Sequence, residues 1–397
     1  MDTVNKQISS FLANSSMIRR MFEAGIELKN KYGKENVYDF SLGNPDLPPP
    51  PEVQEALCKI SASVSEPLSL GYMPNAGYPE LRAKQALAIS AEQGVKIPAN
   101  NVIMTCGAAG GINAFFRAVL TPGDEVLCPA PYFVEYGFYA GNYGGTLKPV
   151  MSDPDDFSLN LPAFEAAFNA NTRAVILNSP NNPTGRIYTR AELEGLAELI
   201  KAAEKRYGRA IYVVSDEPYL FLNFDGVEIP PVFQIFERSV IIGSYSKSLS
   251  LPGERIGYVA VNPATPDVEV LVNAIILCNR ILGFVNAPAV AQKILLEAIG
   301  AQVDLNTYRE RRSAMSEVLD AAGFEYFMPQ GAFYFFPKSP VEDERKLVDA
   351  LLAERVLAVP GSGFGAGGYV RLAFCVNVEN IRASRDSFIR AMANLKG

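Results

Sequence analysis

The sequence predicts an α/β fold whose main feature is a mostly parallel β-sheet covered by helices. From about residue 101 onward, short apolar runs alternate with longer stretches of helical periodicity. The apolar runs are continuous, which is typical of strands buried on both faces. A strand–helix–strand order built from such strands favours a sheet between helical layers.

Several apolar runs carry this prediction. The expected strands cover residues 101–105, 125–128, 173–178, 210–214 and 239–243. One expected helix covers 112–120. Another extends to about residue 206, and it begins at Thr189 because Thr189 and Glu192 have the spacing of a capping box.

The pattern changes after about residue 290, which indicates a second and smaller α+β domain. A long helix is expected through residue 308 to 321, and the elements after it are a strand at 332–336, a helix at 343–354 and a strand at 369–374. The N-terminal segment is expected to pack with this part. We therefore expect a large domain at 47–290 and a small domain formed by 1–46 and 291–397.

Composition excludes several classes of protein. Lys and Arg total 36 and Asp and Glu total 43, which gives a formal net charge of −7. An acidic chain does not fit a nucleic-acid surface, which needs a basic patch. No run reaches the roughly 18 apolar residues of a membrane span, and residues 1–10 lack the apolar run of a signal peptide. We expect a cytoplasmic protein without nucleic-acid or membrane partners.

The chain has no histidine, and its five cysteines are odd in number and lack CxxC spacing. The absence of histidine excludes Ser-His-Asp and Cys-His catalysis and most transition-metal sites, so no metal is expected. The cysteines suggest neither disulfides nor zinc. Proton transfers in an enzyme of this composition must use Lys, Tyr, Asp, Glu or Cys, or a cofactor.

Polar or glycine-rich clusters follow or end the predicted strands. A small-residue turn at 106–111 leads into a helix and could bring backbone N–H groups to a phosphate. Further clusters lie at 178–185, at 215–219, at 244–247 and around Arg371. Each alone is equally typical of a turn. Together they indicate one shared site, because ligands bind at the carboxyl ends of the strands in open α/β sheets.

These clusters occur in the order found in one family. The runs are SLGNP at 41–45, SPNNPTG at 179–185, Ser-x-x-Lys at 244–247, RIGY at 255–258 and YVRL at 369–372. The chain resembles the fold type I pyridoxal-5′-phosphate (PLP) enzymes, in particular class I and II aminotransferases similar to aspartate aminotransferase. The resemblance covers almost the whole length. It implies a seven-stranded sheet in the large domain and transfer of the amino group of an L-amino acid to a 2-oxo acid by ping-pong chemistry.

The resemblance implies roles for the residues around the cofactor ring. Lys247 would hold PLP as an aldimine and, once freed, carry the proton from the substrate Cα. Asp216 would pair with the pyridine nitrogen and keep it protonated. Asn182 and Tyr219 would hydrogen-bond the ring hydroxyl oxygen. Phe133 matches the aromatic residue that stacks on the ring, although a core phenylalanine is a fair alternative.

The phosphate and the subunit interface follow from the same resemblance. The amides of Ala108 and Ala109, the Ser244 hydroxyl and the Arg255 guanidinium would bind the phosphate. Tyr72 matches a tyrosine that reaches the phosphate of the neighbouring subunit. The resemblance therefore implies a homodimer with shared active sites.

Arg371 would bind the α-carboxylate of the substrate, with help from the Gly43 amide and Asn182. Two positions depart from aspartate aminotransferases. Where one subgroup has a lysine for the distal carboxylate, this chain has Ala109, and where another has an arginine from the partner chain, it has Ile281, with Arg280 beside it. Recognition of an acidic donor is therefore open, and a neutral or aromatic donor fits equally.

The family's histidine beside the pyridine-binding aspartate is also missing. The matching position falls near Tyr136, whose hydroxyl could donate to Asp216 instead.

Two other functions on the same fold stay open. A PLP-dependent lyase or synthase, of the carbon–sulfur lyase or aminocyclopropane-carboxylate synthase type, would share most of these residues. A non-enzymatic PLP-binding regulator would also share them, but such proteins carry a basic DNA-binding domain that this acidic chain lacks.

Overall fold

The computed structural model describes residues 3–14 and 16–396. Its centre is a seven-stranded sheet of order β2-β8-β7-β6-β5-β3-β4. The strands are β2 Val102–Cys106, β3 Glu125–Ala130, β4 Thr146–Met151, β5 Thr172–Asn178, β6 Tyr212–Asp216, β7 Ser239–Ser244 and β8 Ile256–Val261. Strands β3 to β7 pair in parallel, whereas β8 is antiparallel to β2 and β7. The predicted α/β fold with a mostly parallel sheet is confirmed.

Two strands of this sheet are absent from the sequence prediction. Strand β4 lies at the edge and is largely exposed, with Pro149 inside it, so it has no continuous apolar run. Strand β8 is buried along its whole length, but no α-helix separates it from β7; only the 3₁₀ helix Pro252–Glu254 lies between them. A strand–helix–strand pattern does not reveal such a strand.

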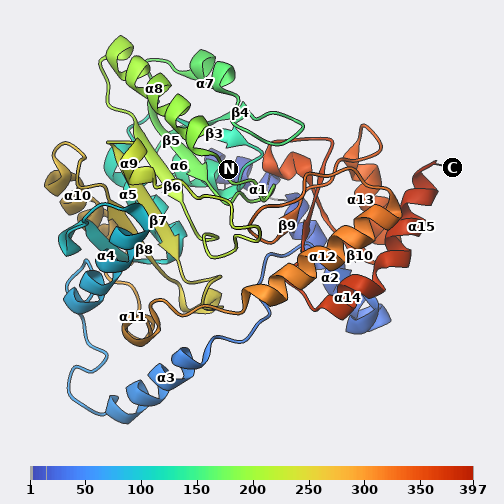
Figure 1. Cartoon of the computed structure of the whole chain (residues 1–397), viewed down its shortest axis with the longest axis horizontal. Coiled ribbons are helices and arrows are strands. Elements are labelled where there is room, and N and C mark those ends of the chain that lie inside the picture. Colours follow the sequence, from blue (N-terminus) through green and yellow to red (C-terminus); the bar gives the residue numbers. More distant parts are fainter. Residues whose placement is uncertain (1–2, 15, 397) are drawn as a thin grey trace.

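Helices cover both faces of the sheet (Figure 1). One face is covered by α5 Gly107–Val119, α6 Glu135–Gly141 and α10 Val268–Ile281. The other is covered by α4 Pro79–Gln93, α8 Arg190–Tyr207, α9 Val232–Ile235 and α11 Ala289–Ala298. Helix α3 Pro51–Ser63 packs against α11, and α7 Leu161–Ala167 packs beside α8. Successive strand residues point to opposite faces, so Val214 packs on the α5 side and Val213 on the α4 side.

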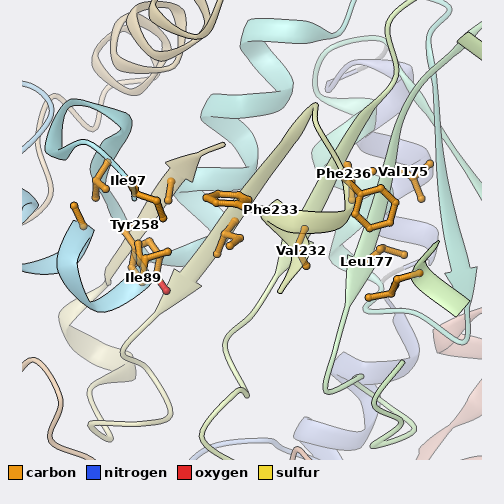
Figure 2. Packing of buried hydrophobic residues seen from close by; sticks show 14 of the residues in the cluster. Ile89, Ile97, Val175, Leu177, Val232, Phe233, Phe236 and Tyr258 are labelled. Carbon is orange, nitrogen blue, oxygen red and sulfur yellow. The ribbon is translucent and has the colours of Figure 1, made fainter. Parts of the chain in front are cut away.

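The core on the α4 side extends across the sheet. Figure 2 shows it running from Ile89 and Tyr258, near α4 and β8, past Phe233, to Val175 and Leu177 on β5. The predicted capping box starts α8: the Thr189 side chain accepts from the Glu192 amide, and the Glu192 carboxylate accepts from the Thr189 amide.

A second region contains α12 to α15, which Figure 1 shows gathered with α2 and β9 away from α4 and α10. Its elements are α2 Ser16–Tyr32, β1 Tyr38–Asp39, α12 Leu305–Ala322, β9 Tyr334–Phe335, α13 Glu344–Ala353, β10 Val356–Leu357, β11 Val359–Pro360, β12 Val370–Ala373, α14 Val378–Ala383 and α15 Arg385–Lys396. Helix α1 Lys6–Asn14 contacts α6 instead: the Phe11 and Phe138 ring centres are 4.7 Å apart, and the Gln7 side chain donates to the Gly141 carbonyl. Strand β1 pairs with β10, and β12 lies between β11 and β9. The domain limits stay a prediction of the sequence.

Four short 3₁₀ helices complete the described elements: Lys34–Asn36, Ala99–Asn101, Pro252–Glu254 and Gly361–Phe364. Over residues 3–14 and 16–396, no helix has the length and apolar character needed to cross a membrane.

Candidate active site

The ends of β5, β6 and β7 bring the polar clusters of the sequence to one edge of the sheet. Asn178 pairs in register with Asp216, and Ser244 ends the next strand. A cavity of about 160 Å³ opens at this edge. The site residues predicted from the sequence that line it are Ala108, Ala109, Phe133, Asn182, Asp216, Tyr219, Ser244, Lys247 and Arg255.

Asp216 lies at the buried end of this cavity. Its side chain is buried, and the Tyr136 hydroxyl donates to Oδ2 at 2.5 Å. The other oxygen, Oδ1, is buried and has no hydrogen-bond partner within the described part of the chain. Burial raises the pKa of Asp216 to about 7, against the opposing effect of the Tyr136 hydrogen bond. The sequence-based expectation that Tyr136 donates to Asp216 is confirmed.

Lys247 stands in the turn after β7. Its Nζ donates to the Gly43 carbonyl at 2.6 Å and lies 5.2 Å from the centre of the Phe333 ring. The pKa of Lys247 is lowered to about 8, mainly by burial and to a smaller extent by the positive charges of Arg371 and Arg255, against the opposing effect of Cys375. The amine can therefore gain or lose a proton near neutral pH.

The glycine-rich turn starts α5 beside a cation. Gly107 has a φ of +68°, and a Cβ there would lie 2.8 Å from the guanidinium Nη2 of Arg255, so a larger residue would be strained and crowded. Ala108 and Ala109 follow in the first turn, where backbone N–H groups have no partner inside the helix. Free amides at a helix N-terminus next to a guanidinium form an anion site.

Arg371 on β12 reaches the same region from the second part of the structure. It donates to the Asn182 Oδ1 at 3.2 Å and to the Ser41 carbonyl at 2.7 Å. Its guanidinium carbon lies 4.5 Å from the ring centre of Phe364, and Nε is buried without a partner among the described residues. A buried guanidinium with an unused donor can bind a further anion.

Sequence reasoning missed Tyr334 on β9. Its hydroxyl lies 3.2 Å from the Tyr219 hydroxyl, and its ring centre lies 4.7 Å from the Arg371 guanidinium carbon. A Cβ at Gly43 would clash with the Tyr334 hydroxyl, so this close approach requires glycine. Tyr334 lies in a run of aromatic residues that has the pattern of a core strand, and nothing in that run distinguishes its hydroxyl.

Some of the singled-out residues lie outside the cavity. Tyr72 is 91% exposed and lines a separate cavity of about 280 Å³ with Phe284 and Asn286. Arg280 and Ile281 end α10 and are exposed. Gly43 and Arg371 do not line the cavity either, but hydrogen bonds connect them to Lys247 and Asn182, which do.

Over residues 3–14 and 16–396, no group of three or more Cys, Asp or Glu side chains is arranged to hold a metal ion. The described cysteines are all free, including Cys106 and Cys375 near the cavity.

Comparison with known proteins assigns the family. Residues 35–388 match the model of the family "Aminotransferase class I and II". The chain is 33% identical to the aspartate/prephenate aminotransferase of Thermus thermophilus, over 89% of this chain and 90% of that protein. It is 30% identical to an asparagine–oxo-acid transaminase of Streptococcus mutans, over 87% of this chain and 89% of that protein.

Solved structures agree with this assignment. An aminotransferase from Eubacterium rectale superposes with a TM-score of 0.95 at 37% identity, and the match covers 100% of both chains. The fold, the polar strand ends and these relatives all agree that the chain belongs to the class I and II aminotransferases, which are PLP-dependent enzymes.

Proposed function

We propose that Lys247 is the residue that binds the cofactor and that Asp216 is the partner of its ring nitrogen. The observation that carries this proposal is the buried Oδ1 of Asp216, which has no partner within the described residues. A protonated pyridine nitrogen is the donor that such an acceptor needs. The start of α5 and Arg255 fit the phosphate at the other end of the cavity, and the Lys247 amine fits the aldehyde.

Bound PLP supplies an aldehyde for covalent attachment and a ring that withdraws electrons from the substrate Cα. Around it, Asp216 holds the positive charge of the ring nitrogen, and Tyr136 fixes the Asp216 carboxylate. Phe133 borders the cavity at 5.5 Å from the Tyr136 ring, in an edge-to-face contact. Asn182 and Tyr219 are polar groups on the same wall, suited to the ring hydroxyl oxygen.

Lys247 carries the proton in this proposal. A pKa of about 8 lets Nζ accept the proton of the substrate Cα at neutral pH and release it again. Arg371 holds the substrate α-carboxylate through its free Nε and its Nη groups, while Asn182 orients it from the side. Gly43 lies next to Lys247, since its carbonyl accepts a hydrogen bond from the Lys247 Nζ.

Borohydride reduction of the holoenzyme, followed by peptide mapping, tests the assignment of Lys247. The pyridoxyl group is expected on Lys247, and a label on any other lysine contradicts the proposal. A panel of amino donors with 2-oxoglutarate and pyruvate then separates transfer from elimination. Transfer requires the 2-oxo acid and yields a new amino acid, whereas a lyase releases pyruvate or ammonia without one.

The donor is proposed to be neutral or of broad specificity rather than acidic. The two curated relatives above are named for different donors at nearly equal identity, so relatedness does not select one. Ala109 lines the cofactor cavity and brings no charge, and Ile281 is apolar. Arg280 is the nearest alternative cation in the sequence.

We also infer that the enzyme is a homodimer with shared active sites. Leu68, Leu70, Tyr72, Ile281 and Phe284 are exposed, and Leu70, Tyr72 and Phe284 line one cavity. Exposed apolar side chains gathered in this way favour a protein–protein interface.

Mixing an inactive Tyr72→Phe or Tyr72→Ala variant with inactive Lys247→Ala tests this inference. Hybrid dimers with one intact site should recover activity if subunits exchange. A strictly monomeric active species in sedimentation would exclude the shared site.

A cytoplasmic location is also inferred. It is supported by the five free cysteines, which fit a reducing compartment.

A further inference from the structure

A second cavity, of about 460 Å³, lies on the α4 side of the sheet. It is bounded by α4, by the chain after β6, and by the segment at 299–302 that follows α11. Pro218 and Ser244 line this cavity and the cofactor cavity, so a thin wall separates the two. None of the groups assigned above to the reacting atoms of the substrate lines the second cavity.

Glu217 lines this second cavity and is 7% exposed. The Ser215 hydroxyl donates to its Oε1 at 2.7 Å. The other oxygen, Oε2, is buried and has no hydrogen-bond partner in the described residues. The pKa of Glu217 is raised to about 8, mainly by burial and to a smaller extent by the negative charges of Glu92 and Asp216, against the opposing effect of the Ser215 hydrogen bond. Protonation would reduce the cost of burying the charge, but it leaves Oε2 without a partner.

The charges of the cavity wall are of one sign. Glu217 and the exposed Glu92 line it, and no Lys or Arg does among the residues that the structure describes. Gln85 and Tyr245 hydrogen-bond each other on the same wall, while Phe221 adds an apolar surface. Two carboxylates do not make a metal site, and no group of three metal-ligating side chains occurs over residues 3–14 and 16–396.

We propose that this cavity binds a small organic cation that joins an amidinium or guanidinium group to an apolar body. The planar cation donates to Oε2 of Glu217, which otherwise has no donor, and its apolar part lies against Phe221 and the tyrosine rings. The exposed Glu92 attracts the same charge from the side open to solvent. Because the cavity is separate from the cofactor cavity, binding does not require or displace the amino donor.

Benzamidine is a suitable probe because it is a planar aromatic cation and is not a substrate amine. Isothermal titration of the holoenzyme at about pH 9, above the raised pKa of Glu217, should give saturable binding. Benzamide has the same shape without the charge and should bind at least about tenfold more weakly, because it loses the charge-assisted hydrogen bonds. Equal affinity for the two probes, or no binding of benzamidine, overturns the proposal.

Three variants locate the site. Glu217→Gln should raise the Kd of benzamidine by about tenfold or more, and Glu92→Gln by a smaller factor of about two to five, because its charge is exposed. Glu80→Gln is the matched control, since Glu80 is an exposed carboxylate on the same helix α4 and does not line the cavity; its Kd should stay unchanged. An equal loss of affinity in all three variants would indicate general charge attraction and contradict a built site.

A competition titration separates this cavity from the cofactor cavity. With the amino donor at saturation, the Kd of benzamidine should stay the same. A Kd that rises in proportion to donor concentration would show that benzamidine occupies the substrate site, which would overturn the proposal without affecting the assignment of Lys247.

Discussion

Asp216 and Glu217 are neighbours in the chain, yet they face different cavities. Asp216 is the last residue of β6 and meets Tyr136 on the α5 side, whereas Glu217, the first residue after the strand, lines the cavity beside α4. Each has one bonded oxygen and one buried oxygen without a partner in the described residues. Lys247 and Arg255 line the first cavity, whereas no Lys or Arg of the described part of the chain lines the second.

The comparison shows that the burial of a carboxyl and the ligand it can bind have different causes. Burial is the largest cause of the raised pKa of both carboxyls, which is about 7 for Asp216 and about 8 for Glu217. What each carboxyl can bind depends on the charges that its cavity adds. The cations Lys247 and Arg255 line the Asp216 cavity, whereas no Lys or Arg among the described residues lines the Glu217 cavity.

The largest expected effect is on turnover. Asp216→Asn should lower kcat strongly, because losing one partner of a buried charge pair costs about 3–5 kcal/mol, which is roughly a hundredfold to several thousandfold in rate. Glu217→Gln should lower kcat much less, since its carboxyl faces the other cavity. Steady-state kinetics of both variants with the same donor checks this. Equal losses would mean that the two carboxyls act as one unit.

A second expected effect is on stability against pH. In the cofactor-free protein both carboxyls have folded-state pKa values above their ordinary values. At a pH between the ordinary pKa of each carboxyl and its raised folded-state pKa, the folded state holds a proton that the unfolded state has lost. The contribution of these two carboxyls to the free energy of unfolding should therefore be largest below about pH 4 and fall, by on the order of a few kcal/mol, as the pH rises to about 8.

Each substitution should remove part of that slope. Without cofactor, Asp216→Asn and Glu217→Gln should both flatten the decrease in melting temperature between about pH 5 and about pH 8. With the cofactor bound, only Glu217→Gln should still flatten it, because a ring-nitrogen partner keeps Asp216 ionised in the folded state. If Asp216→Asn had the same effect with and without cofactor, the pairing of Asp216 with the ring would be wrong.

Sequence patterns were sufficient for the parts of the site that follow from strand order. Parallel strands end at the same edge, so the clusters after β5, β6 and β7 had to meet once the strands were recognised. The capping box of α8 and the Tyr136–Asp216 hydrogen bond were also foreseeable, because each depends on few residues.

Other features depend on long-range packing that no local pattern contains. Strand β8 is antiparallel to its neighbours in a mostly parallel sheet, so the alternation of strands and helices along the chain does not predict it. Tyr334 is one aromatic residue among several in a core strand, and only the fold brings its hydroxyl to Tyr219. The cavity beside Glu217 is formed by segments more than a hundred residues apart, such as α4 and the turn at 299–302.

Arg371 is a buried cation near the Asp216 cavity, because it donates to Asn182, which lines that cavity. Arg371→Lys should raise KM by about tenfold or more for every amino donor, since a lysine cannot offer the parallel donors that a carboxylate accepts. Arg312→Lys is the matched control, because Arg312 forms a two-donor ion pair with Asp225 at 2.7 Å and does not line the cavity. A KM rise for one class of donor only would place Arg371 at the distal end of the substrate.

The smallest expected effect is the preference between acidic and neutral donors. Ala109 and Ile281 leave the distal part of the substrate without a matched cation, and an unpaired carboxylate would be costly to desolvate there. Aspartate should therefore gain little over alanine in kcat/KM, within about tenfold. The same measurement in Arg280→Ala shows whether the exposed Arg280 contributes.

Arg280 is the one residue that could reverse this expectation. It ends α10 beside Ile281, on the same exposed surface as the apolar residues of the inferred dimer interface. If aspartate exceeds alanine by roughly a hundredfold, about 2.7 kcal/mol, and Arg280→Ala removes that margin, then Arg280 binds the distal carboxylate. In that outcome the Asp216 cavity would receive a further cation from the partner subunit, and its contrast with the cation-free cavity beside Glu217 would be greater still.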